Sequence, residues 1–135
     1  MTPFLLKIVT PDGAIFEGQV EEVVVRTTTG DLGIQAGHTN CVAPLGMGQA
    51  MILVDAVKRY AACIGGMITV MNGEVRIVAT TFEWADQINV ERAEASERRA
   101  RDLLADKNTP DTDIRMAEAR LKRALVRKGV AANKK

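Results

Sequence analysis

Residues 14–38 read AIFEGQVEEVVVRTTTGDLGIQAGH, and this stretch decides the class of the fold. Its first half is rich in β-branched residues, which favour strands. Its second half is punctuated by glycines and ends in His38, the one histidine of the chain. Glycine supplies the positive φ angles that tight turns need. We therefore expect strands followed by a polar loop over residues 30–39.

Short strand-like runs continue on both sides of this stretch, up to about residue 85. Pro11-Asp12-Gly13 ends the run over residues 4–10, and another run over residues 51–57 stops before Lys58. Asn72-Gly73 between two further runs is the strongest hairpin signal, because both central residues of a type I′ turn need positive φ. Many short strands with regular turns predict a β-sandwich of about ten strands over residues 1–86.

From residue 88 the apolar residues recur at helical spacings of three and four. Two stripes follow this period, one beginning at Val90 and the other at Ile114. Pro110 breaks the pattern between them, the aspartates of residues 111–113 offer a helix cap, and Gly129 is expected to end the second helix. The class is thus α+β: a β-sandwich followed by an antiparallel two-helix hairpin over residues 87–135.

Both helical stripes are narrow and rich in alanine, so the hairpin buries little apolar area. At about 25 cal/mol per Å², docking such a face contributes about a few kcal/mol after the entropy cost. A ligand at about one hundred times its dissociation constant contributes about 2.7 kcal/mol. We interpret the hairpin as a detachable element whose position a ligand can control.

The formal net charge of +1 hides an asymmetry between the two parts. Residues 1–86 carry five Lys/Arg against nine Asp/Glu, whereas residues 87–135 carry thirteen against eight. Such a difference indicates that the two parts meet different partners. No apolar run approaches the ~20 residues that span a bilayer, and no signal peptide is recognisable, so we expect a soluble chain.

The two cysteines, Cys41 and Cys63, stand 22 positions apart without a Cys-x-x-Cys unit. This spacing fits neither a disulfide framework nor a zinc site. We expect two inert, buried thiols and no metal site. The glycines match no phosphate-loop pattern, and His38 has no nucleophile beside it in sequence, so we expect no catalytic residue.

Several motifs together resemble the epsilon subunit of F-type rotary ATP synthases, over residues 4–127. In order they are Ile8-Val9-Thr10-Pro11-Asp12-Gly13, Gly30-Asp31-Leu32-Gly33, Gly37-His38 and the Gly65-Gly66 strand. One departure is Asn40, where the family commonly has proline. The resemblance implies a non-catalytic central-stalk rotor subunit that couples proton- or sodium-driven rotation to ATP synthesis. It also implies inhibition of ATP hydrolysis through the C-terminal helices.

The resemblance also implies partners and a location. The partners are the gamma subunit, the membrane rotor ring of c subunits, and the catalytic alpha and beta subunits, reached through the C-terminal helices. The location is peripheral, on the cytoplasmic face of the bacterial inner membrane. By the same resemblance, Asp31 and His38 face the polar loops of the ring.

Basic residues lie on the second helical stretch, and the resemblance implies that they engage acidic residues of the catalytic subunits. A solvated basic face is the plainer alternative. The residues of this expected inhibitory contact are Arg115, Arg120, Lys122, Arg123 and Arg127.

A nucleotide motif stands at the start of the first helical stretch. Epsilon subunits that bind ATP carry Ile/Leu-Asp-x-x-Arg-Ala there, and this chain has Ile88-Asn89-Val90-Glu91-Arg92-Ala93. Asparagine replaces the aspartate, which leaves the strength of binding open. ATP is thus a candidate regulatory ligand, and no cofactor is required. The candidate nucleotide-binding residues are Glu83, Ile88, Asn89, Arg92, Ala93, Arg99, Arg123 and Arg127.

A nucleic-acid-binding module that uses the basic hairpin is the rival interpretation. Such a module calls for aromatic stacking platforms or a basic domain throughout. The sheet part is acidic instead, and Tyr60 and Trp84 are too few to form a stacking surface. The rival is therefore the weaker reading of the sequence.

Overall fold

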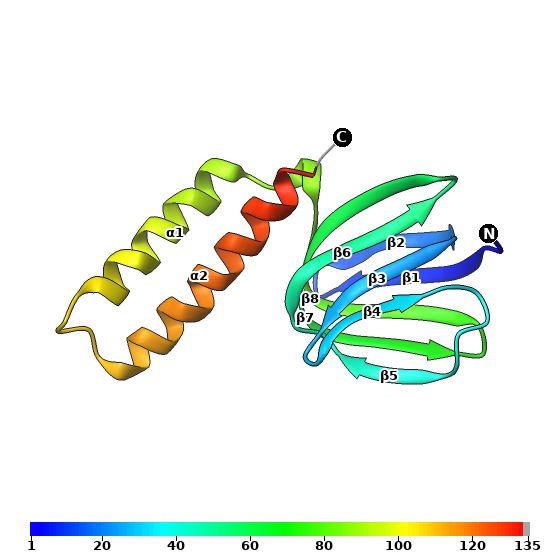
Figure 1. Ribbon diagram of the computed structural model, residues 1–135, viewed down its shortest axis with the longest axis horizontal. Coiled ribbons are helices and arrows are strands. Elements are labelled where there is room, and N and C mark those ends of the chain that lie inside the picture. The colour runs from blue at the N-terminus through cyan, green and yellow to red at the C-terminus, as the bar shows by residue number, and fades with distance from the viewer. Residues whose placement is uncertain (134–135) are drawn as a thin grey trace.

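The computed structural model describes residues 1–133, as a body of strands with a helical hairpin beside it (Figure 1). Eight strands precede a short 3-10 helix and two α-helices. Their bounds are β1 Phe4–Thr10, β2 Gly13–Val20, β3 Glu22–Thr27, β4 Gly30–Ile34, β5 Cys41–Pro44, β6 Met47–Val54, β7 Val57–Met71, β8 Glu74–Trp84, η1 Ala85–Gln87, α1 Val90–Ala105 and α2 Asp111–Ala131.

The strands form a β-sandwich in the order β2-β1-β8-β7-β6-β3-β4, with β5 paired to β7. Only the β1–β8 pair is parallel among the paired strands of the described residues. The 15-residue β7 pairs with β6 through its first half and with β5 through its second half. Because one strand spans both halves, the described residues hold eight strands rather than about ten.

Two glycines allow β7 to change direction between its halves. Gly65 and Gly66 both have positive φ, at 71° and 110°. A Cβ atom added to Gly66 would overlap the backbone carbonyl of Val78 on the neighbouring strand β8. This close approach requires glycine, as expected for a bend between packed strands.

The core between the layers is aliphatic, as the low aromatic content requires. Side chains alternate along the strands, so that one face of each strand fills the core. Leu6, Ile8, Ile52 and Ile77 have no exposed surface. Trp84 at the end of β8 closes one edge, with its ring perpendicular to that of Phe82. The sheet part therefore completes its own core before the helices begin.

The Asn72-Gly73 hairpin is confirmed, with φ angles of 51° and 82° between β7 and β8. The expected break before Lys58 is wrong. β6 ends at Val54, and the turn lies at Asp55-Ala56, where both residues have positive φ. Aspartate tolerates positive φ but alanine seldom adopts it, so the sequence does not signal this turn and the pairing of β6 with β7 reveals it.

Helix α2 differs from the sequence-based expectations at both of its ends. α2 starts at Asp111 after Pro110, so no aspartate side chain caps it, although the acidic first turn complements the helix dipole. Gly129 does not end α2, which continues to Ala131. Val130 and Ala131 are buried, and their packing outweighs the about 1 kcal/mol that glycine costs inside a helix.

The hairpin touches the sandwich through a small apolar cluster, called the docking cluster here. Figure 1 shows that the C-terminal end of α2 meets the sandwich, while the turn between the helices points away from it. The rest of the hairpin is held mainly by contact of α1 with α2. The docking cluster consists of Ala62, Ala85, Ile88, Val130 and Ala131, with Tyr60 and Val126 packed against it.

Neither helix within residues 1–133 combines the length and the apolar character needed to cross a membrane.

Candidate functional site

A cleft of about 720 Å³ lies between the sandwich and the hairpin. Ligand pockets of small molecules commonly have about 300–1,000 Å³, so the cleft has the size of a nucleotide site. Three parts of the chain supply its walls: the turn between β1 and β2, the end of β8 with η1, and both α-helices. The lining residues are Thr10, Asp12, Ile15, Thr80, Thr81, Phe82, Glu83, Gln87, Asn89, Arg92, Ala93, Ser96, Arg99, Arg120, Arg123 and Arg127.

Arginines from both helices converge on this cleft. Arg92 and Arg99 come from α1, and the α2 arginines are spaced three and four apart, which places them on one helix face. The α2 arginines are Arg120, Arg123 and Arg127.

The arginine-rich side of the cleft carries unneutralised positive charge. The Nε atom of Arg127 lies 2.6 Å from Oε1 of Glu83, and this pair joins α2 to β8. Within residues 1–133 the other four arginines form no ion pair. Guanidinium groups bind phosphate oxygens in a bidentate manner, so this side of the cleft suits a polyphosphate.

The two helices are also joined by an ion pair of their own. Glu97 on α1 accepts from Nζ of Lys128 at 2.8 Å and from Nε of Arg101 at 2.9 Å. The hydrogen bond from Lys128, followed by that from Arg101, lowers the pKa of the Glu97 carboxyl. The carboxylate thus stays ionised when α1 and α2 pack together.

Asn89 both caps a helix and lines the cleft. Its Oδ1 accepts from the backbone N–H of Arg92 at 3.0 Å, which makes Asn89 the N-cap of α1. A cap of this kind contributes about 1 kcal/mol. The residue therefore has a structural role that is independent of any ligand.

Seven of the eight candidate nucleotide-binding residues line the cleft together. Ile88 does not, because its side chain is buried in the docking cluster. Arg120 lines the cleft as well, although the sequence placed it only in the inhibitory contact. The seven are Glu83, Asn89, Arg92, Ala93, Arg99, Arg123 and Arg127.

Apart from Glu83 on β8, sequence reasoning missed the residues that the sandwich supplies to the cleft. Thr10 and Asp12 sit in a turn where the Thr10 hydroxyl accepts from the Asp12 backbone N–H at 3.2 Å. Thr80 and Gln87 reach the same cleft from a distant part of the sequence. No local pattern marks these residues, because the pairing of β1 with β8 brings Thr10 and Thr80 together and the docked hairpin then places the arginines opposite them.

The remaining residues of the expected inhibitory contact, Arg115 and Lys122, lie on exposed positions of α2. Neither lines the cleft. The five basic residues therefore divide into three that face the cleft and two that face solvent.

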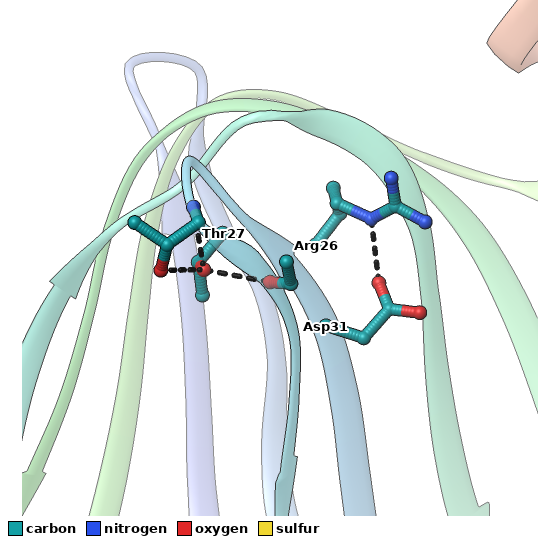
Figure 2. A network of polar contacts seen from close by, with 5 residues as sticks. Arg26, Thr27 and Asp31 are labelled. Atoms are coloured by element: carbon teal, nitrogen blue, oxygen red, sulfur yellow. Dashed lines mark hydrogen bonds and ion pairs between the residues drawn. The ribbon is translucent and has the colours of Figure 1, made fainter.

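Asp31 lies on a strand and not in a loop, which corrects the expected loop over residues 30–39. It is the second residue of β4 and pairs with Arg26 across the β3–β4 hairpin. Figure 2 shows the two side chains side by side, with Arg26 Nε 2.6 Å from Asp31 Oδ1. The Thr27 hydroxyl fixes the turn, since it donates to the Gly30 carbonyl at 2.6 Å and accepts from the Thr29 N–H.

His38 lies in the segment that follows the other end of β4, so β4 separates it from Asp31. Its Nδ1 is 2.8 Å from the carbonyl oxygen of Thr39 and 4.0 Å from Sγ of Cys41.

The two thiols differ, and the expectation that both are buried is wrong for Cys41. Cys41 is half-buried at the start of β5, where its side chain packs against the core but is not enclosed by it. Cys63 is buried, and burial raises the pKa of its thiol to about 12. Within residues 1–133 no group of three or more His, Cys, Asp or Glu could hold a metal ion.

Two family models match the chain. The model for the ATP synthase, Delta/Epsilon chain, beta-sandwich domain matches residues 3–85, and that for the ATP synthase, Delta/Epsilon chain, long alpha-helix domain matches residues 86–131.

Known sequences agree with the family models. An ATP synthase epsilon chain of Bacillus velezensis is 44% identical over 128 residues, covering 95% of this chain and 96% of that one. An ATP synthase epsilon chain of Bacillus licheniformis is 43% identical over 131 residues, covering 97% and 99%.

A solved structure shares the fold. A chain in the Euglena gracilis mitochondrial ATP synthase, in a structure of the OSCP/F1/c-ring assembly, superposes with a TM-score of 0.84. It is 21% identical, and the match covers 99% of this chain and 83% of that chain.

Proposed function

Because the chain belongs to the ATP synthase delta/epsilon chain family, as an epsilon subunit, we propose that its hairpin is a nucleotide-controlled brake on ATP hydrolysis. The nucleic-acid-binding alternative has no support, since both matched families are those of ATP synthase chains. The chain associates with ATP synthase subunits in the central stalk.

The sandwich of residues 1–86 is the coupling part, which joins the gamma subunit to the membrane ring of c subunits. Transmission of torque needs a body that does not deform, and a core filled by fully buried aliphatic side chains supplies one. Asp31 and His38 are the proposed ring contacts. The part has no catalytic role and works peripherally, on the cytoplasmic face of the bacterial inner membrane.

The hairpin of residues 87–135 is the brake, because a small set of contacts holds it to the sandwich: the docking cluster, the Arg127–Glu83 pair and the hydrogen bond from Asn133 to Gln49. An element held this weakly can occupy a second position. The 21 residues of α2 span about 30 Å at 1.5 Å per residue. When the hairpin undocks and α2 points away from the sandwich, this helix is proposed to reach into the catalytic alpha and beta subunits.

One observation carries the proposal: the arginines expected to grip the catalytic subunits line the cleft when the hairpin is docked. Arg120, Arg123 and Arg127 face the sandwich side in this position. The same guanidinium groups cannot serve the cleft and a distant acidic partner at once. A ligand that binds in the cleft favours the docked state and therefore keeps these arginines from contacting the catalytic subunits.

ATP is the proposed regulatory ligand of the cleft, with its phosphates among the arginines. Since both helices and the sandwich contribute walls, the cleft exists only while the hairpin is docked. Occupancy at about one hundred times the dissociation constant would stabilise the docked state by about 2.7 kcal/mol. Bound nucleotide then keeps the complex free to hydrolyse ATP.

The test is the joint replacement of Arg120, Arg123 and Arg127 by alanine in the assembled complex. Hydrolysis should rise under inhibiting conditions, because the grip is lost. Exposed ion pairs contribute only about 0–1 kcal/mol each, so a single replacement is expected to have a small effect. Joint replacement of Arg98 and Lys107, which are exposed and lie outside the cleft, is the control. An unchanged hydrolysis rate in the triple variant would mean that other residues make the inhibitory contact with the catalytic subunits.

A further inference from the structure

One side chain ties the segment of residues 35–40, which joins β4 to β5, to a hairpin that is distant in the sequence. Oδ1 of Asn40 accepts from the backbone N–H of Asn72 at 2.9 Å. Asn72 is the first turn residue between β7 and β8, outside the ladder that closes with Met71 and Glu74. Because this N–H lies outside the ladder, it needs another partner, and the Asn40 oxygen supplies one.

The tie acts on the part of the segment that carries His38. The N–H of His38 donates to the Gln35 carbonyl at 3.3 Å, and its ring nitrogen Nδ1 lies 2.8 Å from the Thr39 carbonyl, so both contacts are local. At its other end the segment is held by the side chain of Gln35, which donates to Glu22 at 3.1 Å. Asn40 thus extends the fixed part of the chain from β5 toward His38.

The tie joins two exposed segments into one surface. Figure 1 shows the β4–β5 segment and the β7–β8 turn at the same end of the sandwich, away from the helices. Asn40, Asn72 and Gly73 are exposed. Met71, directly before the turn, is 52% exposed, and methionine is enriched at protein interfaces relative to other surfaces. Proline, common at the place of Asn40 in the family, has no side-chain oxygen and could not make this bond.

We propose that the Asn72-Gly73 turn contacts the polar loop of the ring subunit together with His38, and that Asn40 is the positioning residue that holds the two segments together. The inference rests on the proposed ring contact of His38 and adds a second segment to it. A surface that is ordered before it binds loses less loop and side-chain entropy on association. The hydrogen bond of Asn40 supplies such order at this end of the sandwich.

Disulfide crosslinking in the assembled complex tests the added segment. Asn72→Cys, in a chain with both native cysteines replaced, should crosslink to a cysteine in the polar loop of the ring subunit about as efficiently as His38→Cys. Asn108→Cys is the matched control and should not crosslink to the ring. Asn108 is also an exposed turn asparagine whose N–H donates to a side-chain oxygen, but it lies in the turn between the helices. A crosslink from His38→Cys without one from Asn72→Cys would overturn the added segment alone, whereas a crosslink from neither would overturn the ring contact itself.

A pair of variants tests the positioning role of Asn40. Asn40→Ala removes the acceptor, whereas Asn40→Asp keeps an oxygen in its place. In the isolated chain, hydrogen exchange of the Asn72 amide should become about fivefold faster in Asn40→Ala, which corresponds to about 1 kcal/mol, and should stay near the wild-type rate in Asn40→Asp.

The complex supplies the functional measurement. Asn40→Ala should slow the crosslinking of His38→Cys to the ring by a similar factor, and Asn40→Asp should restore it. Unchanged exchange at Asn72 in Asn40→Ala would show that the bond does not order the turn. Unchanged crosslinking of His38→Cys, despite faster exchange at Asn72, would overturn the positioning role.

Discussion

Replacement of Val130 by alanine should release the hairpin while sparing the sandwich. Val130 is 2% exposed and belongs to the docking cluster, where α2 meets β7 and η1. The change removes two carbon groups, each worth about 0.8 kcal/mol when buried, or about 1.6 kcal/mol in total. This loss shifts the ratio of docked to undocked hairpin by about fifteenfold. Alanine favours helix more than valine does, so α2 itself should persist.

Amide hydrogen exchange on the isolated chain measures this shift directly. Residues of α2 and η1 should exchange faster in Val130→Ala, whereas β1 and β8 should keep their protection. Leu125→Ala is the control, because Leu125 lies on the same helix with 44% of its surface exposed. In the assembled complex, the chain with Val130→Ala should inhibit ATP hydrolysis more strongly than the wild-type chain does.

Two outcomes would refute this reasoning. Unchanged exchange in α2 would mean that the docking cluster does not hold the hairpin. Equal loss of protection in α2 and in the central strands would mean that hairpin and sandwich unfold as one unit.

Two further predictions concern the sandwich. Gly66→Ala should lower the free energy of unfolding by about 3 kcal/mol or more in a urea titration, since the new methyl group meets the Val78 carbonyl at positive φ. Gly73→Ala, with open space around it, should cost about 1 kcal/mol. Cysteine at Asp31 or at His38, in a chain with both native cysteines replaced, should crosslink to a cysteine in the polar loop of the ring subunit.

These two predictions have clear contradicting results. Equal stability of the two glycine variants would show that β7 and β8 do not need their close approach. Because Asp31 lies near the start of β4 and His38 lies beyond its end, a crosslink from one alone would confine the ring contact to that side of the strand. Efficient crosslinking of both positions to the catalytic subunits would refute the orientation.

The sequence predicted those elements whose signals are local. Asn72-Gly73 marked a hairpin because asparagine and glycine tolerate the φ angles that the turn needs. The helical hairpin was predictable because its apolar period changes at residue 88 and Pro110 interrupts it. The turn at Asp55-Ala56 was not predictable, since alanine prefers negative φ and Ala56 has a φ of 64°. The pairing of the flanking strands β6 and β7 holds it in this conformation.

The same distinction explains the cleft. The helical wall of the cleft was predictable, because the spacing of the arginines places them on one helix face and the motif of residues 88–93 follows shortly after Glu83 in the sequence. The sandwich wall, with Thr10 and Asp12, becomes part of the site only through docking at Val130, more than a hundred residues away. Continuation of α2 through Gly129 has the same origin, because tertiary burial outweighs a local breaker.

The division of the chain into coupler and brake is tested most directly by ending it after Asp86. Complexes assembled with the shortened chain are measured for ATP hydrolysis and for ATP synthesis driven by an ion gradient. The sandwich closes its core at Trp84, so assembly and synthesis should stay at the wild-type level, whereas hydrolysis should rise because the brake is absent. Loss of synthesis, or hydrolysis that stays as inhibited as in the wild type, would contradict the account.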